Sequence, residues 1–143
     1  MKIKVAFLLF CSFALFAAFF LDAPVFAHHG FATEYDGSKY ITITGVLTKV
    51  DWENPHIRFN VDAKAADGKV TSWRFEGSSV AIVERTGTRR RDLVDNIGQT
   101  VTVSACPGKG GIPIGAAEKL KLADGREVII ARQRYYGDGK SSE

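Results

Sequence analysis

Apolar and polar positions divide the chain into an apolar beginning and a remainder of short alternating segments. Residues 40–52 (YITITGVLTKVDW) and 56–63 (HIRFNVDA) alternate apolar and polar side chains, the period-two pattern of a strand with one buried face. Gly45 interrupts the first segment and predicts a bulge or a sharp bend there. The Asp-Gly pair at 67–68 predicts a tight hairpin turn into a third strand over 69–77.

The pattern changes at residues 78–87 (SSVAIVERTG), which offer a serine to cap a helix, an apolar face and a terminal glycine. We expect one short helix here, and Thr88 could cap a second turn over 89–94. The remaining segments are, in chain order, a fourth strand, an irregular loop with four glycines and a last hairpin: 99–105, 106–115 and 116–132.

This order of elements predicts the fold. Three strands, a short helix and two or three further strands favour a mainly β protein. We expect a small antiparallel OB-like barrel of five to six strands, with one short helix between strands 3 and 4 and no parallel strands. A flat meander with a helix on one face is the alternative. Element order alone gives no function.

The apolar beginning has the three parts of a secretory signal. A short positive segment, 1–4, precedes the uncharged run 5–21 and a more polar segment that ends in Ala27. Ala27, with Val25 two residues before it, fits the small-x-small pattern, so we expect cleavage between Ala27 and His28. A transmembrane helix needs about 20 apolar residues, and because the run is slightly shorter, an uncleaved anchor is the alternative.

The expected cleavage would leave a periplasmic or secreted protein with no stable membrane anchor. Removing Lys2, Lys4 and Asp22 from 19 basic and 16 acidic residues leaves 17 and 15, a near balance that gives no reason to expect a nucleic-acid partner. Other partners are not indicated. The chain would have four parts, a signal peptide, an N-terminal arm, a single barrel domain and a flexible tail: 1–27, 28–39, 40–134 and 135–143.

Two of the three histidines, His28 and His29, directly follow the expected cleavage site. A free α-amine on His28 could chelate a metal ion together with its own imidazole, and His29 would add a second imidazole. His56, in the turn between the first two strands, could supply a third if the arm folds back. Nitrogen donors without thiolates favour Cu(II), Ni(II) or Zn(II), so the candidate cofactor is one of these ions, with Cu(II) first, and the alternative is no cofactor. In the alternative interpretation, the histidines are polar spacers or turn residues.

This ligand set resembles the histidine brace of copper monooxygenases and some periplasmic copper carriers. The resemblance is one of ligands, and it does not extend to the fold.

The loops provide a second candidate site, for a ligand or a protein and without a metal. Trp52, Asn54 and Pro55 lie in the first turn, and Cys106 begins the glycine-rich loop. Cys106 would be the only cysteine left after cleavage, so neither a disulfide nor a CxxC centre can form. We expect a buried thiol, and a copper(I) ligand near His56 is the alternative.

Several short motifs carry a resemblance to a known family. They are HHGF at 28–31, WENPH at 52–56, the Asp-Gly turn at 67–68, EGSS at 76–79 and LADGR at 122–126. With these motifs the chain resembles a family of small exported bacterial proteins catalogued as a domain of unknown function. A serine is usual where this chain has Gly30. The resemblance implies export and a small β domain, and it implies no activity.

We therefore predict a small exported binding protein rather than an enzyme, with a copper or other transition-metal site at its new N-terminus. No spacing selects two carboxylates as an acid–base pair, so we expect no catalytic residue. A metal-free OB-like binding module is the first alternative, and a redox enzyme with a copper brace is the second.

Overall fold

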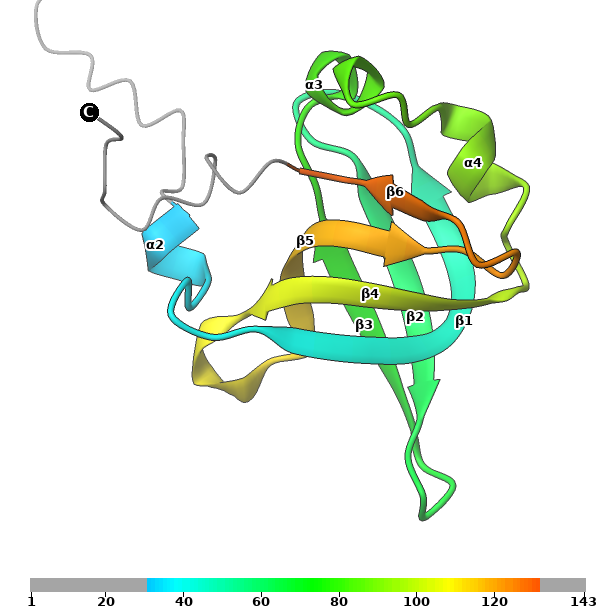
Figure 1. The fold of residues 1–143 in the computed structure, drawn as a ribbon. Coiled ribbons are helices and arrows are strands. Elements are labelled where there is room, and N and C mark those ends of the chain that lie inside the picture. The colour runs from blue at the N-terminus through cyan, green and yellow to red at the C-terminus, as the bar shows by residue number, and fades with distance from the viewer. Residues whose placement is uncertain (1–30, 132–143) are drawn as a thin grey trace, which may run out of the picture.

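The strands of the computed structural model, which describes residues 31–131, form one sheet that closes on itself (Figure 1). The strands are β1 Ile41–Asp51, β2 Arg58–Lys64, β3 Val70–Glu76, β4 Thr100–Pro107, β5 Ile114–Lys121 and β6 Glu127–Ile129. The helices are α2 Phe31–Glu34, α3 Val80–Arg85 and α4 Arg90–Val94, with a single 3-10 turn at Lys109–Gly111. The expected cleavage site, His28, His29 and the tail 135–143 lie outside the described residues.

The sheet has the order β3-β2-β1-β4-β5-β6, and an additional pairing between β3 and β5 closes a five-stranded barrel. This confirms the predicted mainly β, OB-like barrel. The expectation of no parallel strands is wrong at this closing pair, because β3 and β5 run parallel over three residue pairs. The reason is geometric: strands in a closed ring of five cannot alternate direction all the way round.

Gly45 does not mark the bulge in β1. The register shift in the pairing with β2 lies between Leu47 and Lys49. At Gly45, β1 passes so close to β2 that a Cβ atom would collide with the carbonyl oxygen of Asp62. The glycine therefore permits a close approach of two backbones, and the bulge follows it.

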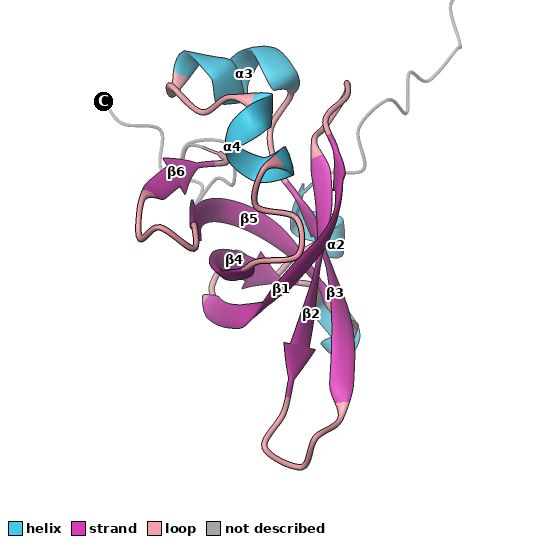
Figure 2. Ribbon diagram, turned by 90° about the vertical axis from the view of Figure 1, so that its right-hand side faces the viewer, coloured by secondary structure: helices cyan, strands magenta, loops and turns pink. Residues whose placement is uncertain are grey.

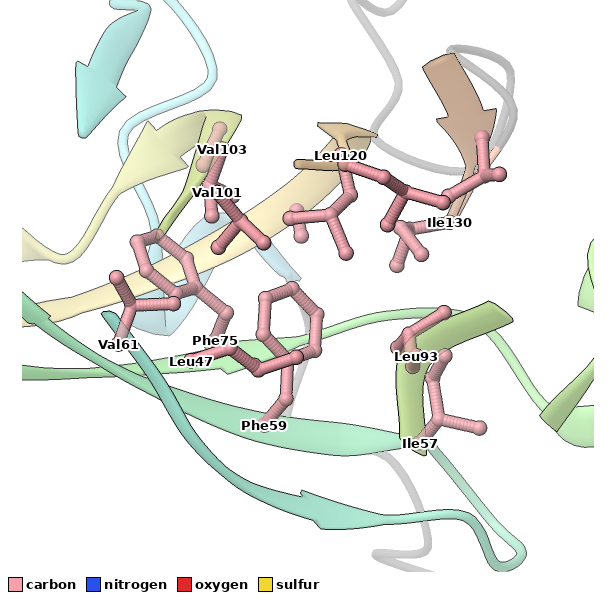
Figure 3. Packing of buried hydrophobic residues seen from close by; sticks show 14 of the residues in the cluster. Leu47, Ile57, Phe59, Val61, Phe75, Leu93, Val101, Val103, Leu120 and Ile130 are labelled. Atoms are coloured by element: carbon pink, nitrogen blue, oxygen red, sulfur yellow. The ribbon is translucent and has the colours of Figure 1, made fainter. Parts of the chain in front are cut away.

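The inward-facing side chains form a cluster that we call the inner cluster. Phe59 and Phe75 lie at its centre with ring centroids 5.5 Å apart, facing Val101, Val103 and Leu120 across the barrel interior (Figure 3). Its buried members are Leu47, Ile57, Phe59, Val61, Phe75, Val83, Leu93, Val101, Val103, Ala105, Ala117, Leu120, Leu122, Val128 and Ile130.

Two short helices, α3 and α4, lie between β3 and β4, where the sequence predicted one short helix over 78–87 and a second turn over 89–94. Both lie at the same end of the barrel (Figure 2), and each places one buried residue, Val83 or Leu93, in the inner cluster. Gly87, with φ +95°, separates them. Thr88 does not cap α4, because its hydroxyl donates to the carbonyl of Ile129 at 2.9 Å.

Candidate functional site

The N-terminal arm is docked on the outside of the barrel. Ala105 and Ala117 belong to the inner cluster, so their neighbours Cys106 and Ala116 face outward. These two, with Ile114 and Tyr35, form a second buried cluster against which Phe31 packs, and we call these five residues the outer cluster. Figure 1 shows α2 on the side where β4 ends and β5 begins.

Backbone contacts fix the arm in the same place. The amide of Asp36 donates to the carbonyl of Pro107 at 2.9 Å, and Tyr35 forms an isolated antiparallel bridge with Gly108. The ring of Phe31 stacks on that of Tyr35 with centroids 5.4 Å apart. The first described residues of the arm are therefore part of the folded structure.

Tyr35 lies in the electrostatic field of the outer face of β2 and β3. Burial raises the pKa of its phenol well above the ordinary value, and the carboxylates of Glu76 and Glu34 raise it further. Arg74 and Arg58 act in the opposite direction. Tyr35 is thus neutral at physiological pH. Among the neighbouring charges, Glu76 has the largest effect on its pKa.

His56 is held at the end of β3 by two groups. Its Nδ1 lies 3.0 Å from the carbonyl oxygen of Gly77 and 3.7 Å from Oε1 of Glu76. A carbonyl oxygen can only accept a hydrogen bond, so Nδ1 carries the proton and the neutral ring keeps its free lone pair on Nε2. The side chain is 36 % exposed, so Nε2 belongs to a partly accessible imidazole.

Glu76 links His56 to the barrel and to the arm. Its Oε2 accepts a hydrogen bond from Nε of Arg58 at 3.3 Å, across the β2–β3 pairing that sets these residues opposite each other. The same carboxylate influences Tyr35 in the arm. The arm and the first loop therefore share one charged neighbour, although they are far apart in the sequence.

The other predicted site residues have structural partners. Trp52 is half-buried and packs against the inner cluster. Asn54 accepts a hydrogen bond from the amide of Val80 at 3.3 Å and so caps α3, and Pro55 follows it after a cis peptide bond. Cys106 is buried, as expected, and burial raises the pKa of its thiol.

Sequence analysis did not assign roles to Glu76, Arg58 or Tyr35. Glu76 appeared only as the first residue of the EGSS motif at 76–79, and nothing in the sequence spacing connects it to His56. Their proximity depends on the register of β2 against β3, which the alternating pattern does not specify. For Tyr35, the aromatic spacing Phe31-x-x-x-Tyr35 in an otherwise polar arm was the available signal.

The described residues include one of the three histidines predicted as metal ligands, His56, and no complete site. Within residues 31–131, no three His, Cys, Asp or Glu side chains come together in a way that could hold a metal ion. The other two predicted ligands, His28 and His29, precede the described part of the chain. In that described part, no helix has the length and apolar character that crossing a membrane requires.

The fold and the site define a small OB-like barrel with a docked N-terminal arm and a histidine at the edge of its β2–β3 face. The chain belongs to the family of unknown function DUF6152, whose model matches residues 18–117. This confirms the predicted resemblance to a family of unknown function. No curated protein matches the chain.

Proposed function

We propose that this chain is a small exported binding protein that carries Cu(II) at its mature N-terminus. The ligands would be the α-amine and imidazole of His28, the imidazole of His29 and Nε2 of His56. The observation that carries the proposal is the position of Glu76, which is beside His56 and also acts on Tyr35 of the docked arm.

The length of the chain limits how far from Phe31 the α-amine of His28 can lie. His28 precedes Phe31 by three residues, which span at most about 10 Å when extended. Phe31 is anchored in the outer cluster, on the side of the barrel that adjoins Glu76 through the pairing of Glu76 with Ala116. The strand that carries Ala116 of the outer cluster thus runs beside Glu76, the neighbour of His56.

The hydrogen bond of His56 favours metal binding through Nε2. Histidine ligands usually donate their other ring N–H to a carbonyl or a carboxylate, which fixes the orientation of the ring. The carbonyl of Gly77 provides such a partner at Nδ1. Amine and imidazole donors favour Cu(II) over the other divalent metals of the first transition row.

Cleavage after Ala27 would create the strongest part of the site. Before cleavage the nitrogen of His28 is an amide, and afterwards it is an amine with an ordinary pKa of about 7.7–8.0. Metal binding would therefore begin only after export. Affinity should fall as the pH drops below about 6.5, where imidazoles take up protons.

A copper titration of the exported protein tests the proposal. Intact mass should first show a chain that begins at His28. Cu(II) affinity is then compared with that of a form carrying one extra N-terminal Met and with that of His56→Ala. We expect the Met-extended form to bind far more weakly and His56→Ala to bind measurably more weakly.

Two results would contradict the proposal in different ways. Equal affinity of the mature and Met-extended forms rules out the amine chelate. Loss of binding in the Met-extended form without any effect of His56→Ala would limit the site to the arm and leave the barrel with another purpose.

A metal-free binding module is the second candidate, and the position of two loops favours it. His56 of the first loop contacts Gly77 at the end of β3. The amide of Arg74 in β3 donates to the carbonyl of Pro113, in the loop between β4 and β5, at 3.0 Å. Both loops thus border the outer face of β2 and β3, where OB folds bind oligomers. NMR chemical-shift mapping with added oligosaccharides tests this candidate. The shifts of the mature chain are compared with those of Arg74→Ala.

A further inference from the structure

A carboxylate lies next to His56, and an arginine is paired with that carboxylate. Glu76 approaches Nδ1 of the ring to 3.7 Å, and Arg58 holds the other oxygen of Glu76 at 3.3 Å. The side chains of Arg58 and Glu76 are 39 % and 30 % exposed, so their fields are only partly screened by water. Any cation bound at Nε2 of His56 would feel both charges.

Gly77 and Glu76 act on the ring in different ways. The 3.0 Å contact with the carbonyl of Gly77 is a hydrogen bond, which orients the imidazole. The 3.7 Å separation from Glu76 is too long for a hydrogen bond, so the carboxylate acts on His56 through its charge. The orientation and the charge of the site therefore come from separate groups.

We propose that Glu76 and Arg58 are positioning residues that tune the affinity of His56 for a divalent transition-metal cation in opposite directions. This rests on the proposed function. Glu76 favours the bound cation, and Arg58 opposes it both directly and by neutralising Glu76. The pair holds the site at an intermediate affinity, from which the ion can be released.

Two substitutions separate this electrostatic role from a structural one. Glu76→Gln and Arg58→Gln each break the same ion pair and leave a polar side chain of similar length. Structural damage from losing the pair would change metal binding in the same direction in both variants. The charges themselves would change it in opposite directions.

The experiment is a competition titration of the mature protein with Zn(II) and with Cu(II). We expect Glu76→Gln to bind about tenfold more weakly, within the range typical of groups behind a metal ligand. Arg58→Gln should bind a few-fold more tightly, and both effects should shrink between about 0.05 M and about 0.5 M salt. Glu127→Gln is the control, since it also removes one carboxylate of a cross-strand pair, 3.0 Å from Nζ of Lys119, and should bind like the parent.

The position of the proton on the His56 ring can be measured in the metal-free protein. Nitrogen NMR of the metal-free parent should show His56 with its proton on Nδ1, and Zn(II) should shift the Nε2 signal. A proton on Nε2 would overturn the inference. Weaker binding in both Gln variants, or behaviour equal to that of Glu127→Gln, would overturn it while the proposed function stands. A parent that binds neither metal would remove the proposed function and this inference together.

Discussion

The inner and outer clusters of this barrel are both buried, but they depend on different parts of the chain. The inner cluster consists of strand and helix residues that face one another inside the ring. The outer cluster consists of three strand residues, Cys106, Ile114 and Ala116, together with Tyr35 and Phe31 of the arm. One cluster holds the barrel together, whereas the other holds the arm to the barrel.

This difference teaches how far the barrel depends on its arm. Removing the arm would expose one apolar patch and leave every strand pairing in the barrel in place. Removing a residue from the inner cluster would affect several strands at once. The fold should therefore tolerate loss of the outer cluster much better than loss of the inner one, and four measurements can test this.

The largest effect is expected from Phe59→Ala. The ring of Phe59 is fully buried and stacks on Phe75, so its removal leaves a cavity at the centre of the inner cluster. The free energy of unfolding should fall by about 3–5 kcal/mol in a denaturant titration. A loss below about 1 kcal/mol would show that the two clusters contribute alike.

Gly115→Ala should have the next largest effect, because Gly115 lies between the two clusters. An added Cβ would meet the ring of Phe75 at 2.8 Å and the Cβ of Ala105 at 3.2 Å. Both neighbours are buried and cannot move into solvent, so we expect a loss of about 1–3 kcal/mol in unfolding free energy. An unchanged unfolding midpoint would mean that the strands around Gly115 can shift to accommodate a Cβ atom without loss of stability.

Tyr35→Ala should lower the free energy of unfolding by less, about 1–2 kcal/mol. The reason is that an undocked arm regains part of its conformational entropy. The informative readout is hydrogen exchange. The amide of Asp36, bonded to Pro107, should exchange much faster, while amides of β1 and β2 keep their protection. Faster exchange throughout the barrel would contradict the separation of the clusters.

The smallest effect, on the order of 1 kcal/mol, is expected from alkaline pH. The pKa of Tyr35 in the folded protein lies above its unfolded value of about 10, so the stability it contributes is complete below pH 10 and declines as the pH rises further. Tyr35→Phe keeps the ring and should flatten the fall of unfolding free energy above pH 10. Cys106, whose pKa burial also raises, remains in both proteins as an internal control.

The sequence predicted the inner cluster well because alternation is a local signal. Ile57, Phe59 and Val61 were assigned to one face of a strand, and all three are fully buried. The outer cluster gave no such signal. Cys106 and Ile114 lie in the segment predicted as an irregular loop, although β4 extends to Pro107 and β5 begins at Ile114.

The candidate site could be predicted only in part, for a similar reason. His56 was identified from its residue type and its place in a turn. Its neighbours Arg58 and Glu76 come together through strand register, which depends on long-range pairing. The contact of Asn54 with α3 is also long-range, because its partner Val80 lies 26 residues further along the chain.

The burial of Cys106 gives the arm a built-in chemical reporter. Its side chain is buried in the outer cluster together with Tyr35, and within residues 31–131 it is the only cysteine. Because Cys106 is 3 % exposed, alkylation should be slow while the arm is docked and faster when the arm lifts or the barrel unfolds. The rate of alkylation, divided by that of a free thiol, therefore measures how often the arm opens. The same measurement with metal present would show whether an ion bound by both the N-terminus and His56 makes the arm open less often.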